Sequence, residues 1–236
     1  MSRRLTVTTA VGAALLAVGL LTGCAGTGAP APTDVEELEL DAAWLDGGRS
    51  IAVTTWGSSG CIPIAEAAEV DAQGALTVTL VDRPNDGDTE QACTTDYVQR
   101  ATVVGVPEGV DPAQELEITV TYGGAVGDTD LDGIAGQPGP GTPTEYTPSA
   151  GWVDDDGTFA LLTWGSSTCA PVIEDVQAAG AEITVTFVTP PADRICTMDM
   201  APRVTLGVVP QLDDAEAYEL VLQGDTFTGT RVPVLG

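Results

Sequence analysis

Alternating apolar and polar residues form the dominant pattern of this chain. In residues 76–80 and 183–187 every second side chain is apolar and the intervening ones are threonine, which is the period of a half-buried β-strand. Comparable runs rich in β-branched residues occupy 50–56, 101–106, 116–122, 158–164, 204–209 and 218–222. Residues 64–72 contain alanines that favour a helix, but the corresponding stretch 172–179 is strand-like. The pattern therefore predicts an all-β fold.

The chain also contains an internal duplication. Several residues recur at one constant spacing: Trp44 as Trp152, Asp46 as Asp154, Thr55 as Thr163, Cys61 as Cys169, Pro63 as Pro171, and residues 56–59 as 164–167. After two short indels the match continues, with Cys93, Thr94, Asp96, Arg100, Thr102 and Pro107 recurring as Cys196, Thr197, Asp199, Arg203, Thr205 and Pro210. Because tryptophan, cysteine and arginine agree in unchanged order, we expect two copies of one module.

The repeats define the expected domains. Residues 35–123 form the first β repeat and 149–236 the second, and the intervening segment 124–148 is rich in Gly, Pro and Asp, which is typical of a linker or long loop. Short, closely spaced strands predict a small β-sandwich or barrel-like module. Modules of under about a hundred residues bury a modest fraction of their surface, so covalent staples are expected.

The N-terminus has the three parts of a secretory signal. Arg3 and Arg4 precede an apolar run at 11–21, and small residues follow. This run is shorter than the roughly twenty apolar residues that span a bilayer. It ends in Leu21-Thr22-Gly23-Cys24, which resembles the lipobox of bacterial prolipoproteins. The resemblance implies a cleaved signal helix at 1–23 and acyl chains such as palmitate on Cys24. It also implies a lipid anchor in the cell membrane, with the protein on the extracytoplasmic face.

An ordinary signal peptide with a chance cysteine is the alternative to a lipoprotein. Cysteine parity favours the lipoprotein, because lipidation of Cys24 leaves an even set of four cysteines for an oxidising compartment. Residues 24–34 would then form a lipidated flexible tether of small residues and prolines. Four cysteines allow three connectivities, and the duplication favours Cys61–Cys93 and Cys169–Cys196, since each module must close its own bridge. A bridge over a loop of this length contributes about 3–4 kcal/mol in the chain-entropy model.

The charge balance excludes one class of partner. Thirty-five acidic residues oppose eight basic ones, a formal net charge of −27, so nucleic-acid binding is not expected. The acidic surface also repels anionic headgroups, which leaves the lipid anchor as the only expected contact with the membrane. We interpret the acidity as a solubility feature rather than as a receptor for polycations. The absence of lysine and the many Ala, Gly, Val and Thr residues fit a high-GC, actinobacterial source.

Two missing residue types limit the chemistry. The chain has no histidine and no lysine, which excludes Ser-His-Asp triads, the usual zinc ligand and Schiff-base chemistry. A pair of carboxylates could still hydrolyse glycosides, but with so many acids such a pair carries little information. We therefore expect a protein that is not an enzyme, and no catalytic residue is assigned.

The twin Trp-Gly-Ser-Ser-x-Cys segments are the sharpest candidate ligand sites. Trp56, Ser58 and Ser59 in the first repeat, and Trp164, Ser166 and Ser167 in the second, could stack on and hydrogen-bond a sugar or peptide. The architectural interpretation, which we prefer, has each tryptophan end a strand and pack on the disulfide while the hydroxyls satisfy turn amides. Arg100 and Arg203 are further candidates, for binding an anion. For them we prefer ion pairs with Asp96 and Asp199.

One segment is a candidate metal site. Asp128, Asp130 and Asp132, followed by Gly133, resemble the first half of the D-x-D-x-D-G calcium loop of EF-hands. The resemblance is incomplete, because Gly139 occupies the twelfth position, where a bidentate Glu belongs, and Ile134 lies one place early. Calcium is the only cofactor considered, and a solvated acidic linker is the preferred interpretation.

The whole chain resembles actinobacterial surface lipoproteins that carry a duplicated W-G-S-S-x-C module, a resemblance that supplies no activity. The expected function is that of a lipid-anchored, extracytoplasmic, non-enzymatic protein that binds an envelope ligand, a cell-wall component or a protein partner. A calcium-dependent adhesion or cell-wall-binding protein is one alternative. A carboxylate-based wall hydrolase is the other.

Overall fold

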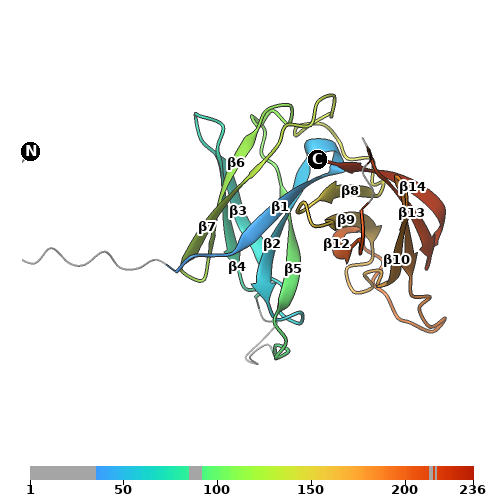
Figure 1. The fold of residues 1–236 in the computed structure, drawn as a ribbon. Coiled ribbons are helices and arrows are strands. Elements are labelled where there is room, and N and C mark those ends of the chain that lie inside the picture. The colour runs from blue at the N-terminus through green and yellow to red at the C-terminus, as the bar shows by residue number, and fades with distance from the viewer. Residues whose placement is uncertain (1–35, 85–91, 213–214, 216) are drawn as a thin grey trace, which may run out of the picture. The chain divides into compact units, whose positions relative to one another are not determined.

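A computed structural model describes residues 36–84, 92–212, 215 and 217–236 (Figure 1). The expected signal peptide, the lipidation site Cys24 and the tether at 24–34 lie outside the described residues. By their contacts the described residues belong to one compact unit, Val35–Gly236. No helix in the described part of the chain is long and apolar enough to cross a membrane.

The described chain is all-β, as the alternating pattern predicts, with one short 3-10 helix, η1 (Asp46–Gly48). The first repeat contains β1 (Leu40–Leu45), β2 (Ser50–Gly57), β3 (Ile64–Val70), β4 (Leu76–Val81), β5 (Val98–Gly105), β6 (Leu116–Tyr122) and β7 (Ala125–Leu131). The second contains β8 (Ser149–Trp152), β9 (Thr158–Gly165), β10 (Ile173–Ala179), β11 (Glu182–Phe187), β12 (Ala201–Val208), β13 (Glu219–Gly224) and β14 (Phe227–Leu235). The alanine-containing segment 64–70 is a strand, like its counterpart.

Both repeats have the same sheet topology. The first pairs its strands in the orders β1-β2-β5 and β3-β4-β6-β7, and the second in the orders β8-β9-β12 and β10-β11-β13-β14. In each four-stranded sheet the central pair, β4–β6 or β11–β13, is parallel. In the second repeat a short parallel pairing of β14 with β8 joins the two sheets into one of seven strands. The duplication in sequence is therefore a duplication of fold.

The prediction of a linker at 124–148 is wrong for its first part. Residues 125–131 form β7, which pairs antiparallel with β6 along its whole length. Gly127 and Leu131 are buried while Asp128 and Asp130 are exposed, so the strand has the usual two-residue period. Its glycine and aspartates resemble a loop by composition. The first repeat thus extends to Leu131, and the connecting segment shrinks to residues 132–148.

Each repeat has its own hydrophobic core between its two sheets. In the first, β1 and β2 pack on β4 and β6 around the buried Trp44, whose indole N–H donates to the Asp132 carbonyl at 2.8 Å. In the second, Phe159 and Phe187 are the largest fully buried side chains. A buried indole N–H needs a hydrogen-bond acceptor, and the acceptor for Trp44 lies in the segment just after β7.

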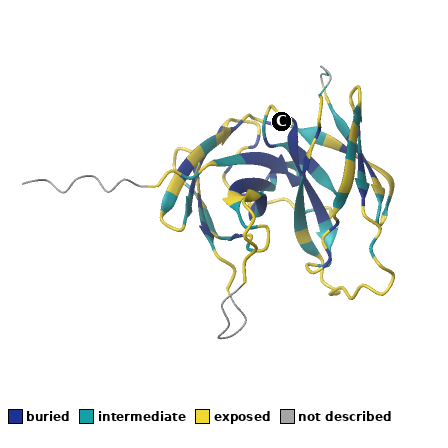
Figure 2. Cartoon of the chain, turned by 60° about the horizontal axis from the view of Figure 1, so that its bottom comes forward, coloured by how far each residue is buried: buried dark blue, intermediate teal, exposed yellow. Residues whose placement is uncertain are grey.

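A third core joins the two repeats. It consists of Ala43, Leu45, Ala52 and Ala101 from the first repeat and Val153, Ala160 and Leu162 from the second. The strands that supply these residues lie beside one another in Figure 1, and Figure 2 shows the buried residues running along them. The central strands β2 and β9 are therefore covered on both faces, which explains why they are buried almost continuously.

The contact between β1 and β8 is close enough to require glycine. A Cβ atom on Gly151 would lie 2.2 Å from the Trp44 carbonyl oxygen. Beside it, the Asp46 backbone N–H donates to Ser149 Oγ at 2.7 Å, and Thr144 Oγ1 donates to the Asp46 carboxylate at 3.0 Å. These bonds fix the start of the second repeat against the turn that follows β1.

We expect Gly151→Ala to lower the free energy of unfolding by about 1–3 kcal/mol, because the new methyl group would overpack the contact with Trp44. Gly105→Ala is the matched control, since Gly105 also lies in a strand and a Cβ there meets nothing within 4 Å. Chemical denaturation of both variants tests this. Equal stability of the two variants would contradict the close β1–β8 contact.

Candidate functional site

Two disulfides anchor the candidate sites. Cys61 is bonded to Cys93 and Cys169 to Cys196, with Cα–Cα distances of 5.3 and 5.7 Å, so both predicted pairings are confirmed. Each bridge fastens the loop after β2 or β9 to the segment that leads into β5 or β12. We call residues 57–61 the first disulfide loop and residues 165–169 the second.

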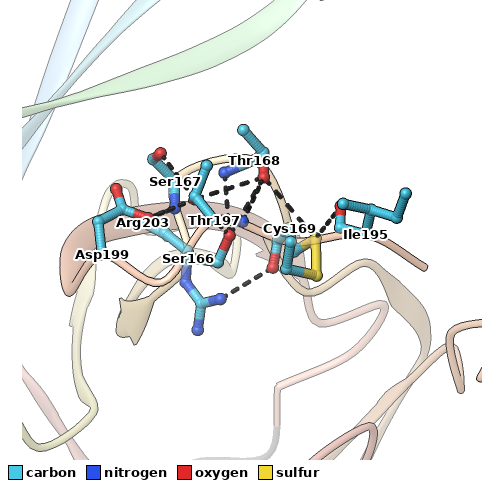
Figure 3. Close-up of a disulfide and its surroundings, with 9 residues drawn as sticks. Ser166, Ser167, Thr168, Cys169, Ile195, Thr197, Asp199 and Arg203 are labelled. Atoms are coloured by element: carbon cyan, nitrogen blue, oxygen red, sulfur yellow. Dashed lines mark hydrogen bonds between the residues drawn. A yellow bond between two sulfur atoms is a disulfide. The ribbon is translucent and has the colours of Figure 1, made fainter. Parts of the chain in front are cut away.

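The serines of the duplicated motif tie these segments together. In the second loop Ser166 Oγ lies 2.8 Å from Thr197 Oγ1, and the Ser167 backbone N–H donates to Asp199 at 3.1 Å, as Figure 3 shows. Ser58 and Ser59 make the same bonds to Thr94 and Asp96, at 2.7 and 3.2 Å. The hydroxyls thus serve the loop itself, as the architectural interpretation predicts.

These bonds also control the charge of the two aspartates. Hydrogen bonds from Thr197 and then from Ser167 lower the pKa of Asp199 to about 2. Bonds from Ser59 and Thr94 lower the pKa of Asp96 in the same way. A carboxylate that accepts several hydrogen bonds favours its charged form. Both groups are therefore anionic acceptors near neutral pH and cannot act as proton donors there.

The arginines are part of the loop scaffold. Arg100 is only 7% exposed and donates to the Cys61 carbonyl, to the Ser58 carbonyl at 3.3 Å and to Thr55 Oγ1 at 3.3 Å. In the second repeat, Arg203 donates to the carbonyls of Cys169 and Trp164 at 2.8 and 3.0 Å. Burial lowers the pKa of Arg203, but an arginine side chain stays charged in proteins.

The predicted Asp96–Arg100 and Asp199–Arg203 ion pairs are wrong. The aspartates accept bonds from loop hydroxyls and amides, and the guanidinium groups point to backbone carbonyls. The ion pairs of the described residues involve Arg49 and Arg231. Three amino acids separate each Asp from its Arg, but the intervening segment enters a strand, so the two side chains do not meet.

The buried guanidinium explains the glycine that follows each tryptophan. A Cβ atom on Gly57 would lie 2.6 Å from Arg100 Cζ, and one on Gly165 would lie 3.0 Å from Arg203 Cζ. Any larger residue would push the arginine away from the carbonyls that it binds. The repeated Trp-Gly pair and the repeated arginine are therefore two halves of one packing arrangement.

The two tryptophans have different surroundings. Trp56 is 41% exposed and stacks on Tyr97, with ring centroids 5.9 Å apart and ring planes 20° apart. Trp164 meets the ring edge of Tyr146 at 5.0 Å, and its indole N–H is buried without a partner. Both tryptophans lie near the end of a strand, as predicted. Their ring contacts are with tyrosines, Tyr97 at 71% exposure and Tyr146 at 56%, but the two ring pairs differ in geometry.

Trp56 lines a groove of about 740 Å³ in the first repeat, which we call the aromatic groove. The lining residues are Trp56, Tyr97, Tyr122, Glu36, Glu37, Leu38, Glu39, Asp82, Gly123 and Ala125. The Tyr122 hydroxyl donates to Asp82 at 2.6 Å and contacts Arg100. Burial, together with the bond to Asp82, raises the pKa of Tyr122, so the hydroxyl keeps its proton.

Of the residues that line this groove, only Trp56 is among the candidate ligand residues predicted from the sequence. The other two aromatic residues are positions where the repeats differ: Met200 stands where the first repeat has Tyr97, and Gly224 stands where it has Tyr122. Residues that the two repeats share belong to the common scaffold, so a comparison for identity between the repeats does not find these tyrosines. The signal that could have found them is divergence between the two copies.

The calcium loop does not form. Asp128 and Asp130 lie on the exposed face of β7, and the Asp132 carbonyl accepts the Trp44 indole N–H. Gly133 is needed for packing, because a Cβ there would lie 2.5 Å from the Ala113 carbonyl oxygen. Among the described residues no three His, Cys, Asp or Glu side chains lie close enough together to hold a metal ion.

No protein-family model, curated protein or solved structure matches this chain.

The loop hydrogen bonds predict a pH dependence. Because the pKa of Asp199 is depressed, its bonds stabilise the second disulfide loop above the ordinary aspartate pKa near 3.8, and this contribution is lost as the pH falls through about 2. The Ser167 amide signal in an NMR titration should therefore shift with a midpoint near pH 2. Asp199→Asn should abolish the step. A midpoint at the ordinary aspartate value would contradict the bonded carboxylate.

Proposed function

We propose that this chain is a lipid-anchored, extracytoplasmic, non-enzymatic binding protein whose ligand site is the aromatic groove. The lipobox-like segment ending in Cys24 supports the anchor. The two disulfides support an oxidising compartment outside the cytoplasm, where such bonds persist. The rigid all-β body would then hold the groove at a fixed geometry on its tether.

The exposed Trp56–Tyr97 pair carries the proposal. Large aromatic side chains in an open groove are costly to hydrate and are common at binding sites. The fold does not require this pair, because the second repeat builds the same sheets and the same disulfide loop with Met200 in place of Tyr97. Binding is a role that explains why Tyr97 and Tyr122 occur in one copy alone.

A non-catalytic role fits the residue types of the chain and the chemistry of the two disulfide loops. The chain offers no histidine or lysine as a general base, and the two arginines of the disulfide loops are occupied by carbonyls. Asp96 and Asp199 stay ionised, so neither can protonate a leaving group in the way a glycosidase acid does. No feature of the described residues favours the calcium-dependent alternative. A cell-wall component or an envelope protein is the expected source of the ligand.

The anchor is tested by Cys24→Ser in a bacterial host that processes lipoproteins. We expect the wild-type protein in the membrane pellet and the variant in the soluble extracytoplasmic fraction, because two or more acyl chains are needed for stable anchoring. Mass spectrometry of the native protein should find acyl chains on an N-terminal Cys24. An unmodified N-terminus upstream of residue 24 would contradict this part of the proposal.

The binding site is tested by retention of residues 25–236 on isolated cell envelopes. This fragment keeps every described residue. Tyr97→Ala should reduce the retained fraction at least threefold, since it removes half of the exposed aromatic pair. Met200→Ala is the matched control: it changes the equivalent position of the second repeat, where the side chain is 62% exposed, and should leave retention unchanged. Equal retention of both variants would move the site away from the groove.

A further inference from the structure

The aromatic groove carries an unusual combination of rings and charge. Its carboxylates, which come from Glu36, Glu37, Glu39 and Asp82, lie around three aromatic side chains. None of the described residues that line the groove is basic. The exposed surface of the groove is therefore both apolar and negatively charged, which is the pattern that attracts a cation.

The cation that contacts Tyr122 of the groove is already used. Arg100 lies over the ring of Tyr122, with 5.6 Å from its Cζ to the ring centroid, but its guanidinium is buried and bonded to the first disulfide loop. Of the four acids, Asp82 accepts a bond from the Tyr122 hydroxyl. That bond comes from a neutral donor, so it leaves the negative charge of the carboxylate in place. The field of the groove thus remains negative.

The second repeat shows that the module folds without the residues of this site. The position of Tyr122 is taken by Gly224, whose Cβ would lie 2.3 Å from the Phe187 carbonyl oxygen. Trp164 contacts the exposed Tyr146 edge to face, so the second repeat lacks the stacked pair of the groove. The same scaffold therefore forms without Tyr97 and Tyr122. Folding of the module does not require these two rings of the first repeat.

Resting on the binding function proposed above, we propose that the aromatic groove recognises a small organic cation, of the alkylammonium or guanidinium class. The exposed faces of Trp56 and Tyr97 attract such a cation by cation–π interaction, which is strongest for tryptophan. The carboxylates add a Coulombic attraction that an uncharged sugar would not gain. A hydrated inorganic cation would gain little from the rings, because its charge stays behind its water shell.

The size of the groove fits a small molecule. Ligand sites for such molecules have volumes of about 300–1,000 Å³, and the groove has about 740 Å³. Trp56 and Tyr97 stack on each other, so the ligand lies on the platform that they form rather than between them. The charged head group of the cation lies over the rings, and the glutamates that precede β1 line the same groove.

Titration of residues 25–236 with choline, followed by calorimetry and tryptophan fluorescence at low salt, tests the inference. The probe for charge is the uncharged isostere of choline, in which a tert-butyl group replaces the trimethylammonium group. We expect choline to bind and the isostere to bind at least tenfold more weakly. Trp56→Ala and Tyr97→Ala should each weaken choline binding roughly three- to tenfold. Raising the salt from about 0.01 to about 1 M should weaken it further, because screening then acts over a few ångströms.

Charge variants supply a second, independent measurement. The double variant Glu37→Gln, Glu39→Gln should weaken choline binding, whereas Glu66→Gln, an exposed glutamate of β3 that does not line the groove, should leave it unchanged. Thermal melting of each variant checks that the fold is intact. Free arginine is the probe for a guanidinium ligand. A Lys/Arg-rich peptide and a neutral wall glycan are the probes for other classes of ligand.

Each outcome has a definite meaning. Equal binding of choline and its isostere, or binding of neither choline nor arginine, overturns the organic cation. Binding of the peptide or the neutral glycan alone also overturns it. If envelope retention still depends on Tyr97 in these cases, the binding function stands with a different ligand. Retention that is indifferent to Tyr97 overturns the binding function as well.

Discussion

The double-sided burial of β2 and β9 is the constraint on which the rest of the structure depends. Each strand packs on its own four-stranded sheet with one face and on the other repeat with the opposite face. Small side chains such as Ala52 and Ala160 let the two three-stranded sheets approach, and Gly151 allows β8 to lie against the Trp44 backbone. Two modules that would each be marginal alone thereby share a third core, which raises the fraction of surface that each buries.

The ends of these strands carry the disulfide loops, and the buried arginines link the loops to the sheets. Because Arg100 satisfies loop carbonyls and requires Gly57 beneath it, the Trp-Gly-Ser-Ser-x-Cys motif is a structural unit in both repeats. Function can then differ at positions that this unit leaves free. Tyr97 and Tyr122 occupy two such positions, and they turn one copy of the scaffold into an open, acidic, aromatic groove.

Sequence patterns located most of the strands but missed those with atypical composition. Residues 76–80 and 183–187 alternate clearly, whereas β8 has only four residues, β1 contains Ala and Asp, and β7 has the composition of a loop. The unpredicted β14 contains Gly229 and Pro233. These strands form because a neighbouring strand or the other repeat covers them, and a local window of sequence does not contain that neighbour. The Asp-Arg ion pairs failed for a related reason, since spacing along a chain does not fix direction once the chain enters a strand.

The sequence by itself determined the all-β class, the duplication and the disulfide pairing, because alternation, repeated rare residues and cysteine parity are properties of the chain read in order. Only the tertiary structure decided that the two repeats share a core, that the arginines bind carbonyls, and that Trp56 is open while Trp164 is covered by Tyr146. These outcomes depend on which distant residues meet. Identical motifs thus acquire different surroundings, because exposure is decided by residues outside the motif.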